Sequence, residues 1–337
     1  MNIKQTFLKQ RSIYLPFLLL LILLSSCTQK QAVSEEQADL STIRYLAYYD
    51  EPVFGGIDNH FVFLDADGHV VKEEIQRMGN KQDIWYSHLE KPLQQFYMFG
   101  DGGLFQIDLA AFKSQEVEII GTTYNIDFQG TDLIYGCDLE QDTGDDYVTN
   151  ACRSSDNSHI LIESQLYDIY CTEELCYFSE VQGDDFRLVT WDDQGVKKQS
   201  VPSLIRDFVT VNGQIYALSE HGMLSVENPS VLIPYVDEAG NETVFYPKVF
   251  GVAEGNIYFT SKMSYKASLQ EQGVVCEPIP ELEGMDIMPS MLENSIVLIE
   301  GNVNTGKTVY DYNYVTQEWS EPVKFDLEKF YHVVQVQ

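Results

Sequence analysis

Short apolar runs rich in β-branched and aromatic residues follow one another from residue 42 to the C-terminus, separated by Gly, Asp and Asn. Runs of this kind, bounded by turn-forming residues, are typical of β-strands. No stretch in this region combines a helical period of apolar positions with helix-capping residues. The pattern therefore predicts an all-β protein.

A polar turn followed by an apolar residue and a tyrosine recurs along the chain. The marker positions of the copies are Tyr97, Tyr135, Tyr177, Tyr216, Tyr258 and, with valine in place of tyrosine, Val297. These positions are 38 to 42 residues apart. Four strands in about 40 residues is the typical size of one β-propeller blade. We therefore expect a β-propeller of about seven four-stranded blades, with six or eight as alternatives because the first and last units are irregular.

The two ends of the repeat region complement each other. Residues 330–336 (FYHVVQV) stand where the first strand of a further unit belongs, whereas the N-terminal unit begins at its second strand. We expect the C-terminal strand to pair with the N-terminal strand, between Ile43 and Asp50, and so to close the ring. Closure removes the exposed strand edges that invite aggregation.

The first 27 residues carry an export pattern. A basic segment with Lys4, Lys9 and Arg11 precedes a short apolar stretch, which ends in Leu-Ser-Ser-Cys at Cys27. The stretch is too short for a comfortable membrane span of about 20 residues. This pattern resembles a bacterial lipoprotein signal, and the resemblance implies that the Cys27 thiol accepts a diacylglyceryl group. A cleaved secretory peptide with an incidental cysteine, or a single-pass anchor, are the alternatives.

Three segments follow from these patterns. Residues 1–26 are expected to be a lipoprotein signal peptide, residues 27–41 the lipidated Cys27 with a flexible polar tether, and residues 42–337 the β-propeller domain. The mature chain resembles the broad group of bacterial β-propeller lipoproteins, although it lacks the Trp-Asp repeat signature of the WD40 family. The resemblance implies an extracytoplasmic protein held on a bacterial membrane by acyl chains such as palmitate.

The composition narrows the classes of function. The chain has 337 residues, with 52 Asp and Glu against 21 Lys and Arg, and a formal net charge of −31. Such a charge repels a polyphosphate backbone, so no nucleic-acid partner is expected. With 44% hydrophobic residues, the chain has ample material for a core, which excludes disorder over most of its length.

Four cysteines are placed to form disulfides in an oxidising compartment. Cys171 and Cys176 flank a short turn in one predicted hairpin, and Cys137 and Cys152 lie on successive strands of another. Buried free thiols or metal ligands are the alternatives, but the spacing does not suit a zinc site. Cys276 has no partner in these two predicted pairs.

Two motifs suggest cofactors at first sight. Residues 301–308 match GxxxxGK[ST], but a strand-like segment follows where a phosphate-binding loop needs a helix, so we expect a hairpin turn and no nucleotide. Five carboxylates crowd residues 138–146. Asp138, Glu140, Asp142 and Asp145 are weak candidates for calcium ligands. The alternative is a solvated acidic loop. No other cofactor is expected.

Acidic residues recur at or just before the predicted first strands of several units, namely Asp83, Asp127, Asp168, Asp207 and Asp286. First strands line the central channel of a propeller, so these residues are candidates for a carboxylate ring that attracts a cationic ligand or basic partner. Trp85, beside Tyr86 and His88, offers a stacking surface for a sugar. The alternatives are ordinary turn and core residues.

The sequence carries few catalytic signatures: no HxH, HExxH or GxSxG motif occurs, and its many carboxylates do not single out a catalytic pair. We expect a non-catalytic binding or scaffold lipoprotein with a protein or glycan partner in the cell envelope. One alternative is a carbohydrate-active enzyme that uses funnel carboxylates. The other is a structural calcium-binding surface protein.

Overall fold

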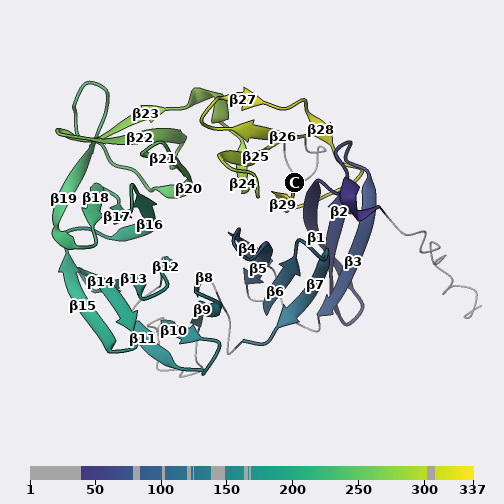
Figure 1. The fold of residues 1–337 in the computed structure, drawn as a ribbon, viewed down its shortest axis with the longest axis horizontal. Helices are drawn as coiled ribbons and strands as arrows, with labels where there is room; N and C mark the ends of the chain where they lie inside the picture. Colours follow the sequence, from purple (N-terminus) through teal and green to yellow (C-terminus); the bar gives the residue numbers. More distant parts are fainter. Residues whose placement is uncertain are drawn as a thin grey trace, which may run out of the picture. The chain divides into compact units, whose positions relative to one another are not determined.

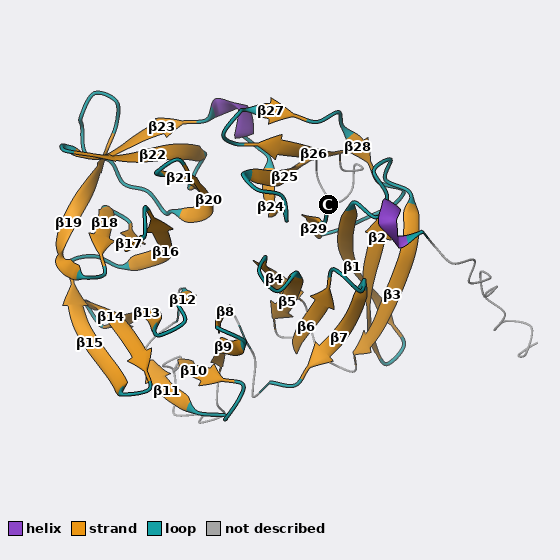
Figure 2. Cartoon of the chain, in the orientation of Figure 1, coloured by secondary structure: helices purple, strands orange, loops and turns teal. Residues whose placement is uncertain are grey.

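Antiparallel β-sheets form most of the described part of the chain from Leu40 to Gln337, which is one compact unit. The computed structural model describes residues 39–78, 84–100, 103–119, 123, 125–137, 149–162, 166, 168–301 and 308–337. Within these residues the only helical elements are two short 3₁₀ turns, η1 (Leu40–Thr42) and η2 (Pro280–Leu282). The predicted all-β fold class is confirmed (Figure 2).

Several predicted features lie outside the described residues: the signal peptide, Cys27, most of the tether, Asp83, and the calcium candidates Asp138, Glu140, Asp142 and Asp145. The predicted domain boundaries and the lipid anchor therefore stay predictions.

Four sheets have four strands each. Their strand orders are β29 (His332–Gln335), β1 (Tyr45–Val53), β2 (Gly56–Leu64), β3 (Val70–Met78); β4 (Ile84–Glu90), β5 (Gln95–Gly100), β6 (Gly103–Asp108), β7 (Lys113–Val117); β8 (Ile126–Gln129), β9 (Asp132–Cys137), β10 (Thr149–Arg153), β11 (His159–Ile162); and β12 (Ile169–Cys171), β13 (Cys176–Gln182), β14 (Asp185–Asp192), β15 (Gly195–Val201).

Two further sheets complete the fold. The eight-stranded sheet has the order β16 (Ile205–Val211), β17 (Gln214–Ser219), β18 (Gly222–Ser225), β19 (Asn228–Val236), β23 (Gly273–Pro278), β22 (Ser264–Gln270), β21 (Asn256–Thr260), β20 (Lys248–Ala253). The last contains β24 (Asp286–Pro289), β25 (Ser295–Glu300), β26 (Thr308–Asn313) and β27 (Glu318–Trp319), with β28 (Val323–Lys324) also pairing with β26.

The eight-stranded sheet consists of two antiparallel halves joined by a parallel contact. Tyr235 and Val236 of β19 pair with Val274 and Val275 of β23. Each half has the same four-strand order as the separate sheets. The predicted count of about seven blades stays a prediction, because this sheet can be counted as one unit or two.

The repeat read from the sequence corresponds to the same strand in six successive units, all except the sheet that contains β1. Tyr97 lies in β5, Tyr135 in β9, Tyr177 in β13, Tyr216 in β17, Tyr258 in β21 and Val297 in β25. Each of these is the strand next to the inner strand of its unit, and all six side chains are buried. The recurring tyrosine is thus a core residue at an equivalent place in successive sheets.

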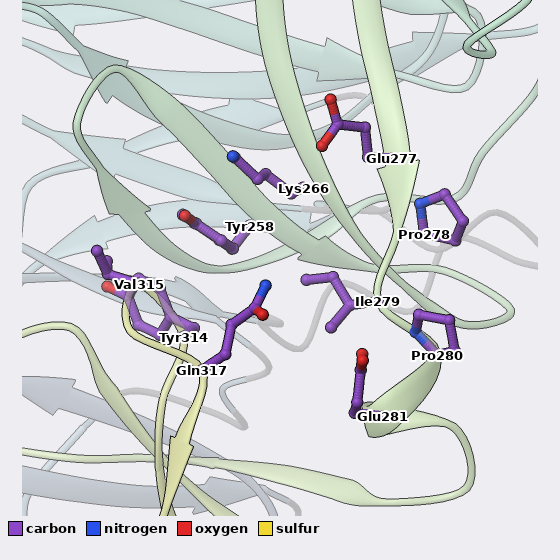
Figure 3. A pocket seen from close by; sticks show the side chains of 10 residues that line it. All are labelled: Tyr258, Lys266, Glu277, Pro278, Ile279, Pro280, Glu281, Tyr314, Val315 and Gln317. Atoms are coloured by element: carbon purple, nitrogen blue, oxygen red, sulfur yellow. The ribbon is translucent and has the colours of Figure 1, made fainter.

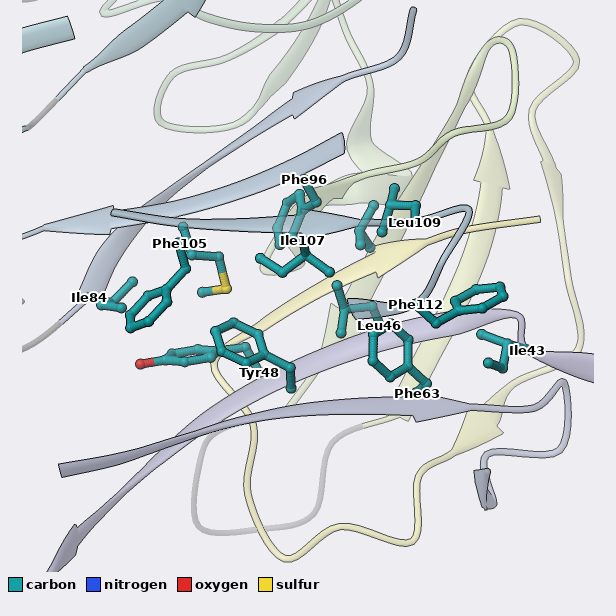
Figure 4. Close-up of a cluster of buried hydrophobic side chains, with 13 residues drawn as sticks. Ile43, Leu46, Tyr48, Phe63, Ile84, Phe96, Phe105, Ile107, Leu109 and Phe112 are labelled. Carbon is teal, nitrogen blue, oxygen red and sulfur yellow. The ribbon is translucent and has the colours of Figure 1, made fainter. Parts of the chain in front are cut away.

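Hydrophobic clusters pack each sheet against the next. The first cluster joins the sheet of β1 to the sheet of β4 and includes Tyr48, Phe61, Phe96 and Phe105 (Figure 4). Five more clusters continue in chain order as far as the sheet of β24. A last one, around Val297 and Val333, packs that sheet against the first. The packing order is therefore cyclic, and the fold is a β-propeller (Figure 1).

The C-terminal strand lies beside the N-terminal one, as the sequence predicts. Strand β29 pairs with β1 antiparallel, from Tyr45 opposite Gln335 to Tyr48 opposite His332. The adjacent cores share this strand, because Val334 packs in the first cluster and Val333 in the last. Alternate residues of a strand point to opposite faces, so β29 contributes to both cores at once.

Side-chain hydrogen bonds stabilise the aspartate-rich turn between β2 and β3. The Asp65 side chain accepts hydrogen bonds from the N–H groups of Asp67 and His69, at 3.0 and 2.9 Å, in the hairpin between β2 and β3. The strand β26 follows the GxxxxGK[ST] match and pairs with β25, where a phosphate-binding loop would require a helix. Residues 302–307 of that match lie outside the described residues.

Candidate functional site

The first strand of each unit lies toward the middle of the ring in Figure 1, and the predicted acidic residues that the structure describes lie in these inner strands or directly before them. Asp127 is the second residue of β8, Asp168 directly precedes β12, and Asp207 lies in β16. All three are half-buried, whereas Asp286, the first residue of β24, is exposed. Trp85 lies in β4.

Three of these carboxylates connect neighbouring units through hydrogen bonds to the backbone. The N–H of Cys171 donates to Asp127 Oδ2 at 2.5 Å, and the N–H of Phe208 donates to Asp168 Oδ2 at 3.2 Å. The N–H of Val249 donates to Asp207 Oδ2 at 2.5 Å. In each case the donor belongs to the inner strand of the next unit. These aspartates therefore have a structural role between units, and their predicted role in ligand binding stays a prediction.

Asp168 and Asp207 form a carboxyl pair. Burial raises the pKa of Asp168 well above its usual range, and the charge of Asp207 and the hydrogen bond between the two groups raise it further. Burial also raises the pKa of Asp207, to about 6, although hydrogen bonds from Val249 N–H and from Asp168 oppose the shift. Two adjacent carboxyl groups with little solvent favour a state in which one is protonated and donates to the other.

A mixed group of side chains meets between β4 and β8. His88 Nε2 lies 3.5 Å from Glu90 Oε2 and 4.0 Å from Asp127 Oδ1, and the three donor atoms all lie within 4.8 Å of one another. The side chains of Glu90 and Asp127 are only 17% and 16% exposed. Burial raises the pKa of Asp127 to about 6. The sequence pattern places His88 beside a predicted stacking surface at Trp85 and does not connect it with Glu90.

An acidic hollow opens where turns of the β8–β11 and β12–β15 sheets meet. Its volume is about 530 Å³. The hollow is lined by Gln129, Asp132, Arg153, Glu173, Glu174, Asp192, Asp193 and Gln194. Asp192 pairs with Gly195 in the hairpin between β14 and β15. No local pattern in the sequence indicates that turns from two sheets converge here.

Among the described residues that line the acidic hollow, Arg153 is the only basic one, and other groups already engage it. Its guanidinium lies 4.8 Å from the ring centroid of Trp191, donates to Gln129 Oε1 at 2.9 Å, and lies 3.5 Å from Asp193 Oδ1. Five carboxylates therefore face one guanidinium, which leaves the hollow strongly negative.

A smaller pocket lies between the β20–β23 half-sheet and the β24–β27 sheet (Figure 3). Tyr258 and Tyr314, with ring centroids 4.6 Å apart, line it together with Lys266, Glu277 and Glu281. Its volume is about 170 Å³. Typical small-molecule pockets measure about 300–1,000 Å³, so this one is small for a ligand.

Both predicted disulfides are confirmed. Cys137 and Cys152 join β9 to β10, and Cys171 and Cys176 join β12 to β13. Cys276 is a buried free thiol whose pKa is raised to about 12 by burial. Two disulfides indicate an extracytoplasmic protein. No helix among the described residues is long and apolar enough to cross a membrane.

No family model matches the sequence, and no curated protein does. Solved structures are similar in fold. A functionally unknown protein from Desulfotomaculum acetoxidans has a TM-score of 0.51 at 11% identity, over 87% of this chain and 98% of that one. The β-propeller domain of the Trilobed protease from Pyrococcus furiosus has a TM-score of 0.46 at 8% identity, over 83% and 95% of the two chains. TolB from Acinetobacter baumannii has a TM-score of 0.43 at 7% identity, over 87% and 66%. At these identities the likeness concerns the fold alone.

Proposed function

We propose that the protein is a lipid-anchored, extracytoplasmic binding module that presents the acidic hollow to a basic segment of another envelope protein or of an exported ligand. The observation that carries the proposal is the hollow itself, where five carboxylates of two neighbouring sheets surround about 530 Å³ beside one engaged arginine. This volume falls within the usual range for binding sites, about 300–1,000 Å³.

The charge of the whole chain supports a basic partner. A net charge of −31 creates a negative potential around the protein, which raises the rate at which cationic molecules arrive. Clustered carboxylates then favour lysine and arginine side chains over neutral or acidic ones. The propeller supports the site because sheets packed through continuous clusters hold their turns in fixed positions.

The anchor belongs to the proposal as well. The Leu-Ser-Ser-Cys sequence at Cys27 supports lipidation, and the polar segment that follows would let the propeller stand away from the membrane. An acidic protein is repelled by anionic lipid, so acyl chains rather than surface charge would hold it there.

Crosslinking and affinity capture from native membranes test the partner. The test variant combines Glu173→Gln, Glu174→Gln and Asp193→Asn, three exposed residues of the acidic hollow. The control combines Glu238→Gln, Glu271→Gln and Asp184→Asn, which are also exposed and change the net charge equally. We expect the test variant alone to lose the captured partner. An identical captured set for wild type and test variant would refute the role of the hollow.

The two alternative functions have weaker support. The pocket of Figure 3 combines two tyrosines with Glu277 and Glu281, the residue types of a sugar-processing site, but it is small for a sugar. The calcium candidates lie outside the described residues. Both alternatives stay predictions.

A further inference from the structure

A second site, separate from the acidic hollow, lies on the inner strands. The chain supplies His88 and Glu90 from β4, two residues apart and therefore on the same face of the strand. Asp127 approaches from β8 in the next unit. One imidazole nitrogen and two carboxylate oxygens thus converge within 4.8 Å.

The spacing of these atoms is close to that of a metal coordination shell. Donors at about 2.0–2.2 Å from a tetrahedral zinc ion lie roughly 3.4 Å from one another. The observed distances from His88 Nε2 are 3.5 Å to Glu90 and 4.0 Å to Asp127. Small side-chain rotations therefore suffice to bring all three atoms into contact with one ion.

The surroundings hold Asp127 and His88 in this arrangement. The Cys171 N–H donates a hydrogen bond to Asp127 Oδ2, while Oδ1 of the same carboxylate faces His88. The Phe128 ring lies 6.0 Å from the His88 ring, centroid to centroid, and shields one side. Ligands of metal ions are commonly oriented by such hydrogen bonds from a surrounding shell.

Charge balance also favours a cation. Within the described part of the chain, His88 is the only ion-pair partner of Glu90 and Asp127. Two carboxylates that are mostly enclosed, beside a single imidazole, leave negative charge without compensation. Enclosed charges are normally paired or bind a metal.

We propose that His88, Glu90 and Asp127 bind one divalent transition-metal ion, Zn²⁺ in the first place, through His88 Nε2 and one oxygen of each carboxylate. The imidazole ligand favours Zn²⁺ over Ca²⁺ and Mg²⁺, which prefer oxygen ligands alone. Three protein ligands leave a coordination position open for water or for a group of a bound molecule.

Isothermal titration calorimetry of the full-length protein in detergent, with ZnCl₂, tests the proposal. We expect one Zn²⁺ per chain and an affinity for Zn²⁺ at least tenfold higher than for CaCl₂. His88→Gln and Asp127→Asn should each weaken Zn²⁺ binding at least tenfold, whereas His221→Ala, at an exposed histidine, should not. Asp127→Asn keeps an oxygen for the Cys171 N–H. If it fails to fold, His88→Gln decides the result.

Cobalt supplies an independent readout. Co²⁺ bound at the proposed site should give a visible absorption spectrum that His88→Gln removes and His221→Ala retains. The proposal is overturned if Zn²⁺ does not bind, if His88→Gln leaves Zn²⁺ affinity unchanged, or if calcium binds as tightly. Because these ligands are distinct from the acidic hollow, neither outcome affects the capture experiment above.

Discussion

The backbone N–H of Cys171 donates a 2.5 Å hydrogen bond to Oδ2 of Asp127, across the boundary between two sheets. Cys171 is also bonded to Cys176, so a disulfide fixes the hairpin that supplies the donor. A covalent constraint in one unit therefore helps to orient a carboxylate in its neighbour. The same carboxylate is a ligand in the metal site that we propose.

Removing the two disulfides should lower stability by different amounts. Cys137 and Cys152 are 15 residues apart and Cys171 and Cys176 only 5. On loop-closure entropy we expect replacement by serine to cost about 3 kcal/mol for the first pair and about 2 kcal/mol for the second. Urea unfolding of each double variant measures these two losses of unfolding free energy. Loss of the Cys171–Cys176 pair should also weaken Zn²⁺ binding, whereas equal Zn²⁺ affinity in both double variants would contradict the coupling.

Asparagine at position 168 should be tolerated far better than alanine. A protonated Asp168 accepts from Phe208 N–H and is hydrogen bonded to Asp207, and an asparagine amide can make both interactions. We expect Asp168→Asn to change the free energy of unfolding by less than about 0.5 kcal/mol at pH 7, and Asp168→Ala to lower it by about 1–3 kcal/mol. Chemical denaturation measures both. Equal losses would show that Asp168 is ionised.

The Asp168–Asp207 pair should make the protein less stable as pH rises. The folded state raises the pKa of Asp207 to about 6 and raises that of Asp168, whereas unfolded aspartate titrates near about 3.9. Between about pH 4 and pH 6 the folded state therefore binds more protons than the unfolded state, so this contribution to stability declines as pH increases. Unfolding of wild type and Asp168→Asn across this range should show a steeper decline for wild type. Parallel profiles would rule out the shared proton.

The strand shared by two cores should be sensitive to truncation. Val333 and Val334 are fully buried in different clusters. We expect Val333→Ala and Val334→Ala each to cost about 1–3 kcal/mol, since each leaves a cavity in a core that joins two sheets. Val231→Ala, at a 54% exposed position, should change stability by less than about 0.5 kcal/mol. Thermal unfolding measures the three variants. Melting temperatures equal to that of the wild type for all three would contradict this prediction.

Cys27→Ser should release the protein from the membrane. The thiol of Cys27 is the expected site of lipidation, and serine cannot form the thioether. We expect labelling with a palmitate analogue to disappear and the protein to leave the membrane fraction. Cys276→Ser, which removes a buried thiol, is the control and should keep the label. A labelled Cys27→Ser protein would refute the anchor.

Local patterns in the sequence were sufficient for much of the fold. The tyrosine repeat predicts its strand because each turn, apolar residue and tyrosine belong to one short segment, as at Tyr135 in β9. The pairing of β29 with β1 could be predicted because each end of the repeat region lacks what the other supplies. The parallel contact between β19 and β23 involves two residue pairs only and has no local signature.

The candidate sites depend on contacts between units, which local patterns do not reveal. Glu90 and Asp127 are almost a whole repeat apart in the sequence, and they approach each other because their two sheets pack together. Glu173 and Asp193 belong to turns that look like any other polar turn until two sheets bring them together. The carboxylates of Asp168 and Asp207 suggested a channel surface, but hydrogen bonds to the next strand engage them.

The pairing of Tyr45 with Gln335 also sets the order in which this protein can be built. As the polypeptide emerges from the ribosome or the translocon, one edge of β1 stays unpaired until nearly the entire chain, including β29, has emerged. Contacts of such long range are slow to form, and a waiting strand edge is open to wrong partners. Until β29 docks, the unpaired edge of β1 is therefore the place in this fold where wrong strand pairing has the longest time to occur.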